Sequence, residues 1–122
     1  MKAHELSGNR MLMLKCGRKR YFVPSGTILY ARKCRSGSIV MTEQGELVHS
    51  GRLDAFEKEL TWTFCRCHSS YIVNFRHVVR FGSDDITMDN GEIISISRAY
   101  RKSVAEFIDG LVKRTDEDMI GK

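Results

Sequence analysis

The sequence predicts a mainly β domain with two short helices, and three observations lead to this fold class. Short segments of alternating apolar and polar residues recur along the chain and are separated by turns rich in Gly, Ser, Asn and Asp. The pair Asn90-Gly91 is the strongest hairpin signal, because both residues tolerate positive φ. Only two segments place apolar residues at helical spacing, and they do not form a helix-turn-helix.

The length of 122 residues indicates one domain with a hydrophobic core that needs no disulfides. We assign residues 11–113 to this domain. Residues 1–10 are polar and are expected to form a flexible N-terminus, and residues 114–122 a flexible C-terminal tail.

In the first half of the chain, we expect strands at 11–15, 20–24, 28–33, 38–42 and 46–49, paired as hairpins. A short amphipathic helix follows, because Leu53, Phe56 and Leu60 recur at helical spacing. Ser50 is the expected N-cap of this helix.

The second half is centred on the segment 64–77, which reads as a strand, a tight polar corner and a second strand. Further strands are expected at 77–81, 86–88 and 92–96. Ser97 is the expected N-cap of the last helix, which should end near Gly110. Its apolar positions 100, 104, 107, 108 and 111 share one face, so the helix should pack on a sheet.

The charge distribution favours a polyanionic partner. The formal net charge is +5 and the pI is about 9.2. Cations cluster at 18–20, 32–35, 76–80 and 98–102, and acids at 54–59, 84–85 and 116–118. This segregation predicts one basic face and one acidic face, and random clustering on a solvated surface is the alternative.

The polar corner is the first candidate binding site. Arg66, Ser69 and Ser70 are donors of the kind that hold a loop on backbone phosphates. His68 belongs to the same corner, although it could instead bond internally and stabilise the turn.

Two further segments carry candidate contacts. The turn at 32–38 presents Lys33 and Arg35 among small residues that allow close approach to a groove. Arg98, Arg101 and Lys102 lie in the first turn of the last helix, where the helix dipole disfavours cations and a bound phosphate would offset the repulsion. Arg98 is also suited to bidentate bonding of guanine. The alternative for both segments is an ordinary solvated surface.

Other kinds of site are disfavoured by the residue pattern. Cys65, Cys67 and His68 lack the spacing of a zinc site, and no second ligand pair follows. We therefore expect no metal, no cofactor and no catalytic residues, and read the four cysteines as free thiols. No signal peptide or membrane-spanning run is present in the sequence, so a cytoplasmic location without membrane insertion is expected.

Two motifs resemble those of one known family. The run Phe64-Cys65-Arg66-Cys67-His68-Ser69-Ser70-Tyr71-Ile72-Val73-Asn74 resembles the central signature of LytTR-type DNA-binding domains. Asn90-Gly91 followed by Ile94-Ser95-Ile96-Ser97-Arg98 resembles the closing signature of that family. The resemblance covers residues 11–111, nearly the whole chain.

The resemblance implies small stacked antiparallel sheets and DNA binding through inter-strand loops instead of a recognition helix. It matches the first loop to residues 33–38, the second to residues 68–70 and the third to Arg98 and the residues after it. The position of Ser69 often carries a longer polar side chain in the family, and the first loop lacks a His or Asn at its tip. Family members bind repeated sites, so a homodimer on DNA is a further expectation.

Our first hypothesis is therefore a sequence-specific regulator of transcription that binds double-stranded DNA. Family members commonly carry an upstream phosphorylation-receiving domain, so this chain is either free-standing, which we favour, or cut from a longer response regulator. The alternative is a protein-interaction module whose basic face binds an acidic partner. Single-stranded nucleic acid is disfavoured, because Trp62, Phe64, Tyr71 and Phe75 are expected in the core and not as stacking platforms.

Overall fold

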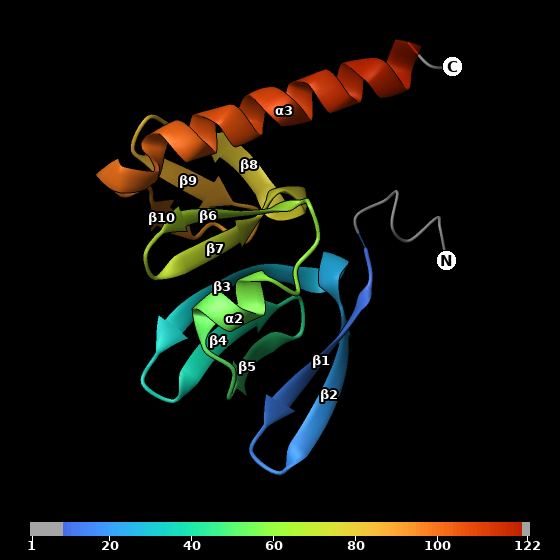
Figure 1. Ribbon diagram of the computed structural model, residues 1–122, viewed down its shortest axis with the longest axis vertical. Coiled ribbons are helices and arrows are strands. Elements are labelled where there is room, and N and C mark those ends of the chain that lie inside the picture. The colour runs from blue at the N-terminus through green and yellow to red at the C-terminus, as the bar shows by residue number, and fades with distance from the viewer. Residues whose placement is uncertain (1–8, 121–122) are drawn as a thin grey trace.

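The computed structural model describes the backbone of residues 9–120 and the side chains of residues 9–113. Its strands form three antiparallel sheets (Figure 1). The two-stranded sheet contains β1 (Met11–Cys16) and β2 (Lys19–Pro24). The five-stranded sheet has the order β5 (Gly45–His49), β4 (Gly37–Thr42), β3 (Ile28–Cys34), β7 (Tyr71–Asn74) and β6 (Phe64–His68). The three-stranded sheet contains β10 (Ile93–Ser95), β9 (Asp85–Met88) and β8 (Val78–Phe81).

The five-stranded sheet lies in the middle of the molecule and has a hydrophobic cluster on each face. Successive side chains of a strand point to opposite faces of the sheet. Both faces are covered, so the side chains of the central strands are buried on both. Tyr30 and Val73 therefore join a cluster with the three-stranded sheet and the C-terminal helix. Ala31 and Ile72 join a second cluster with the β1–β2 hairpin and helix α2 (Leu53–Glu57). This layering confirms the predicted fold class of small stacked antiparallel sheets with helices.

Polar contacts also connect the layers. The amide of Asn74, fully buried, donates to the carbonyl oxygens of Ser25 at 3.3 Å and Ile28 at 2.8 Å. The ring of His77 lies 2.7 Å from both the Asp89 carboxylate and the Gly26 carbonyl. Both side chains hold the single-turn 3₁₀ helices η1 (Ser25–Thr27) and η2 (Phe75–His77) in place. Asn74 thereby satisfies backbone carbonyl groups of a segment that is distant in the sequence.

The Asn90-Gly91 hairpin between β9 and β10 is confirmed, with a local difference. Gly91 has a φ of 92°, whereas no non-glycine residue in the described part of the chain has positive φ. The Asn90 side chain instead accepts a hydrogen bond from the Glu92 N–H at 3.0 Å. The turn therefore uses the hydrogen-bonding side chain of Asn90 and the conformational freedom of Gly91.

The helices differ most from expectation. Helix α2 (Leu53–Glu57) ends before Leu60, and its N-cap residue is Arg52 instead of Ser50, with no side-chain cap bond. The 3₁₀ turn η3 (Arg98–Tyr100) precedes helix α3 (Arg101–Ile120), and Ser97 makes no side-chain cap bond to it.

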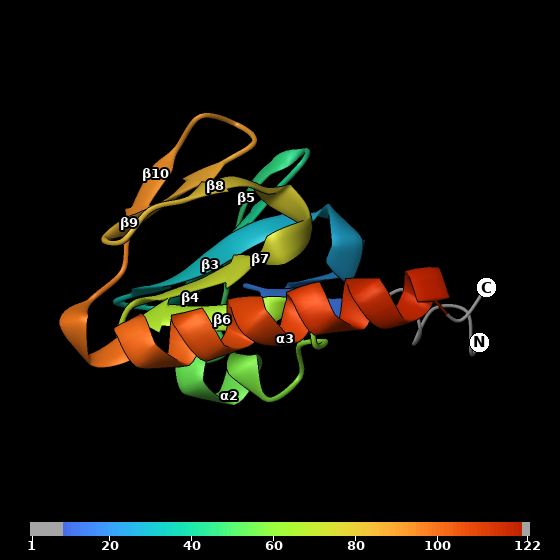
Figure 2. The same ribbon diagram turned by 90° about the horizontal axis from the view of Figure 1, so that it is seen from above.

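Helix α3 also continues to Ile120, although it was expected to end near Gly110. Glycine weakens a helix by about 1 kcal/mol, but no proline follows and most of the next residues favour helix. Residues 114–120 of the expected flexible tail are thus helical in their backbone, while residues 121–122 and the expected N-terminal segment 1–8 lie outside the described residues. Viewed from above, α3 passes beside β6 (Figure 2). In the described chain, no helix combines the length and apolar character needed to span a membrane.

Candidate nucleic-acid interface

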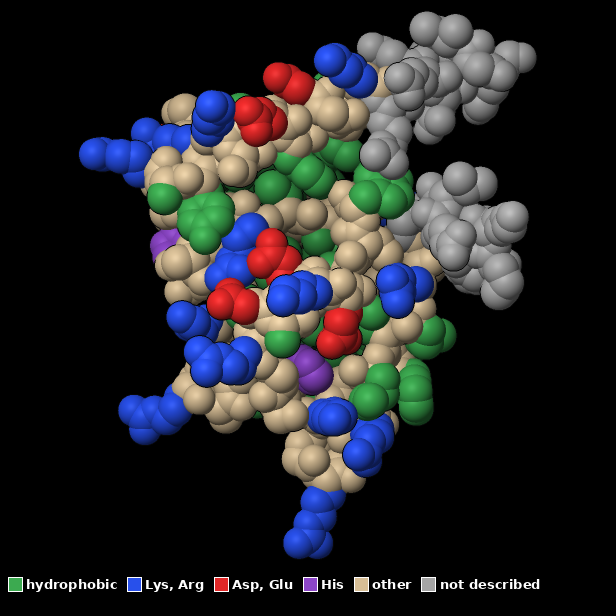
Figure 3. Space-filling view, in the orientation of Figure 1, with side chains coloured by type: hydrophobic (Ala, Val, Ile, Leu, Met, Phe, Trp, Pro, Cys, Tyr) green, Lys and Arg blue, Asp and Glu red, His purple; other side chains and the backbone are tan. Residues whose placement is uncertain are grey.

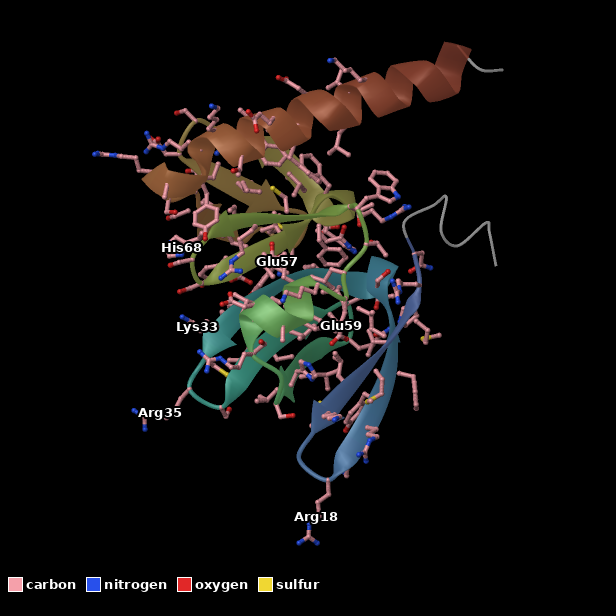
Figure 4. All side chains as sticks on the ribbon, viewed as in Figure 1. Arg18, Lys33, Arg35, Glu57, Glu59 and His68 are labelled. Carbon is pink, nitrogen blue, oxygen red and sulfur yellow. The ribbon has the colours of Figure 1, made fainter. Side chains whose placement is uncertain are left out.

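Three segments that are distant in the sequence meet at one edge of the molecule. The Lys33 N–H donates to the Ser70 carbonyl at 2.9 Å, which joins the β3–β4 turn to the corner between β6 and β7. The Ser97 N–H donates to the Cys67 carbonyl at 3.0 Å, which joins the approach to α3 to the same corner. We call this surface, formed by residues 33–37, 68–70 and 97–102, the cationic edge. Figure 4 shows Lys33, Arg35 and His68 along the left side of the molecule, where α3 also begins.

The β3–β4 turn presents two cations to solvent. Lys33 and Arg35 are exposed, and neither side chain has a hydrogen bond or ion pair with another described residue. The turn packs closely against the end of β5 at Gly37, which has a φ of 144°. A Cβ atom at this position would lie only 2.3 Å from the His49 carbonyl oxygen. The Ser38 hydroxyl also donates to the Gly51 carbonyl at 2.7 Å.

This close packing brings a further cation to the turn. Arg52 lines a hollow of about 390 Å³ together with Lys33 and Arg35. Sequence reasoning missed Arg52, because its place depends on the contact between Gly37 and the end of β5, and no local pattern indicates that contact.

The corner between β6 and β7 is held by side chains that bond to its backbone. His68 Nδ1 accepts a hydrogen bond from the Ser70 N–H at 3.0 Å, and its ring meets Tyr71 edge-on with centroids 5.8 Å apart. The strand pairing shifts register between Arg66 and His68, which is typical of a β-bulge that redirects the chain. The Ser69 side chain is exposed, while Ser70 is half-buried.

Arg66 is bonded on all sides within the domain. Its Nε donates to the His68 carbonyl at 2.9 Å, and Nη2 donates to the Ser69 carbonyl. Its Nη1 lies 2.6 Å from Glu57 Oε1 and 3.1 Å from Asp54 Oδ1. Burial alone would lower the pKa of Arg66, but the hydrogen bonds to Glu57 and Asp54 outweigh it and raise that pKa. The sequence identified Arg66 as part of the corner but not its carboxylate partners.

The approach to α3 brings three cations to the edge, and they differ in availability. Arg98 and Lys102 are exposed, and neither side chain has a hydrogen bond or ion pair with another residue of the described domain. Arg101 forms an ion pair with Asp84 at 2.8 Å, with half of its side chain still exposed. Arg98 can therefore bind a phosphate or a base directly, whereas Arg101 would first have to release Asp84.

The charges do not separate into opposite faces as the sequence predicted. Figure 3 shows Lys and Arg side chains along the left margin, over the middle and at the lower end of one face, with acidic side chains over the middle and the top of the same face. Two of the acidic residues of α2, Asp54 and Glu57, are the partners of Arg66. Exposed cations with no carboxylate partner among the described residues lie at the cationic edge and also at the β1–β2 turn, where Arg18 projects from the tip (Figure 4).

The cysteines of the corner are structural. Burial raises the pKa of Cys65 to about 11 and that of Cys67 to about 12, and both side chains belong to one core cluster. All four cysteines are free thiols. Within residues 9–113, no group of three or more His, Cys, Asp and Glu side chains is placed to hold a metal ion.

The comparison with known families identifies the fold. Residues 18–109 match the family model of the LytTr DNA-binding domain. The chain belongs to the LytTR family. The match spans most of the chain, including the corner and the approach to α3, and DNA is therefore the partner of this domain at the level of the family.

A solved structure agrees with this LytTR assignment. The LytTr DNA-binding domain of a protein described as a methyl-accepting/DNA response regulator from Bacillus cereus superposes with a TM-score of 0.71 at 28% sequence identity. The alignment covers 80% of this chain and 95% of that one. No curated protein matched the chain. The resemblance inferred from the two sequence motifs is confirmed.

Proposed function

We propose that this LytTR domain recognises a specific double-stranded DNA sequence through the turns of its cationic edge and thereby regulates transcription. The observation that carries the proposal is the pair of backbone hydrogen bonds, Lys33 to Ser70 and Ser97 to Cys67, that joins the three segments. Side chains from three turns can then contact one duplex together. Exposed cations without carboxylate partners among the described residues supply the attraction to phosphate.

The candidate residues divide into two roles by their chemistry. Arg98, Lys33, Arg35 and Ser69 are exposed at the edge and are assigned to the grooves. Ser70, Arg101 and Lys102 are assigned to the phosphates, and Arg52 joins them because it lines the same hollow as Lys33 and Arg35. His68 uses Nδ1 to hold the corner, which leaves Nε2 for the duplex.

We extend the proposal to the setting of the protein. Binding occurs at repeated sites, and two copies occupy them as a homodimer on DNA. The protein works in the cytoplasm, either free-standing or as the output domain of a response regulator. Sedimentation on duplexes with one and two sites measures the number of bound copies.

Arg98→Ala tests the specific function. After selection of bound fragments from a genomic pool, affinities are measured for the selected site and for random DNA at several salt concentrations. Loss of a bidentate guanine contact should cost about 1–3 kcal/mol on the selected site and much less on random DNA. Equal losses on both would make Arg98 a phosphate contact. If no sequence is enriched at moderate salt, an acidic protein partner becomes the better explanation of the cationic edge.

A further inference from the structure

The Arg66 guanidinium connects the corner to helix α2, and we call its contacts the Arg66 bridge. On the corner side, it donates to the carbonyl oxygens of His68 and Ser69. On the helix side, it binds Glu57 and Asp54. The Arg66 side chain is only 13% exposed, and its Nε, Nη1 and Nη2 atoms all bond within the domain.

The corner depends on this bridge for its shape. The pairing of β6 with β7 is irregular at this point, and the carbonyl oxygens of His68 and Ser69 bond to the arginine. Without the guanidinium, both oxygens lose that donor. A planar guanidinium offers its donors in a rigid fork, which fixes direction as well as distance.

Helix α2 in turn fixes the arginine. Leu53 and Phe56 are almost fully buried in the second hydrophobic cluster, so the helix is held firmly against the five-stranded sheet. Glu57, the last residue of α2, binds Arg66 Nη1 at 2.6 Å from this anchored position. The second hydrophobic cluster is therefore connected to the backbone of the corner through α2, Glu57 and Arg66.

The carboxylates of α2 also need an explanation, because they lie close to a surface proposed to bind a polyanion. A negative charge near DNA weakens binding by electrostatics alone. We propose that Arg66 is a positioning residue, held by Glu57 and Asp54, that sets the shape of the corner for DNA without contacting a phosphate. This inference rests on the proposed function.

A pair of matched variants separates positioning from charge. Glu57→Ala and Glu59→Ala each remove one negative charge next to α2, but only Glu57 binds Arg66. Glu57→Ala should weaken binding to the selected site on the order of tenfold, although it makes the domain more positive. Glu59→Ala should leave this affinity unchanged or slightly increase it. Tighter or unchanged binding by the Glu57→Ala domain would overturn the proposal.

Arg66→Lys supplies the second measurement. A lysine can replace a phosphate contact as a point charge, but it cannot bond two carbonyl oxygens and a carboxylate as a fork does. The variant should therefore lose affinity for the selected site while keeping the wild-type slope of affinity against salt. Retention of full affinity would show that Arg66 acts only through its charge.

Two controls keep the outcomes distinct. Thermal unfolding of each variant is recorded, and if Glu57→Ala does not fold at the assay temperature, Arg66→Lys decides the question. Arg98→Ala is measured in the same titrations. If Arg98→Ala loses specific affinity while the Glu57 and Arg66 variants do not, the bridge has no role in recognition and the proposed function stands. If the wild-type domain has no sequence preference, the proposed function itself fails.

Discussion

At the scale of single residues, three of the arginines expected to contact DNA differ in their surroundings. Arg98 is exposed without a described partner, Arg101 is paired with Asp84, and Arg66 is enclosed by two carboxylates and two carbonyl oxygens. The sequence could identify these residues as cations near turns. It could not identify their partners, because Glu57 and Asp84 reach them only through packing between separate elements.

His49 provides a test of the packing at this scale. Burial lowers the pKa of His49, whose Nδ1 accepts a hydrogen bond from the Lys15 N–H at 3.0 Å and whose ring packs against Phe56. Because the unfolded chain then binds the proton more tightly, stability should be complete above a pH of about 6.5 and decrease as the pH falls below it.

Urea unfolding of the wild type and of His49→Gln at pH 7.5 and pH 5.5 measures this effect. The glutamine oxygen can still accept the Lys15 N–H but does not titrate. The wild type should lose more stability on acidification than the variant, and an equal loss in both would contradict the role of His49.

At the scale of elements, the strands were predicted to within a few residues, whereas the helices were not. Alternating apolar residues and turn residues are local signals, and they place most strands correctly. The ends of α2 and α3 depend on other forces. Leu53 and Phe56 anchor α2 by burial, and neither helix uses the serine cap that the sequence favoured. Arg98 therefore lies in the 3₁₀ turn η3 and not in the first turn of α3.

The β3–β4 turn gives a prediction about an element. Alanine at position 37 would combine a strained φ of 144° with a Cβ placed 2.3 Å from the His49 carbonyl. Alanine at position 45 would have a comparable strain at a φ of 117° but no atom within 4 Å. The strain should cost about 1–3 kcal/mol in both variants, and the steric contact should destabilise Gly37→Ala further.

Chemical unfolding of both glycine variants compares the two costs directly. Similar free energies of unfolding would mean that the close approach of β4 to the end of β5 contributes little to the domain.

At the scale of the whole molecule, the distribution of available charge should govern binding. Lys102 is exposed at the cationic edge, whereas Arg76 is exposed at the end of β7 opposite the corner. If DNA lies on the edge, Lys102→Ala should reduce the slope of log affinity against log salt concentration by about 0.9, and Arg76→Ala should leave it unchanged.

Fluorescence anisotropy over a range of salt concentrations measures both slopes. Equal reductions would indicate that the duplex responds to the overall net charge of +5 and not to one edge. The sequence supplied the net charge and the clusters, but the three-dimensional grouping required the pairing of β3 with β7 and of Ser97 with Cys67.

The spacing between the three turns depends on main-chain groups, since the N–H groups of Lys33 and Ser97 bond to the carbonyl oxygens of Ser70 and Cys67. Only a proline at position 33 or 97 would remove one of these donors. The side chains at positions 33, 35, 69 and 98 can therefore vary while the scaffold keeps its geometry. A domain built in this way can acquire a new operator preference by single exchanges, and these four positions are a natural starting library for redesigning it.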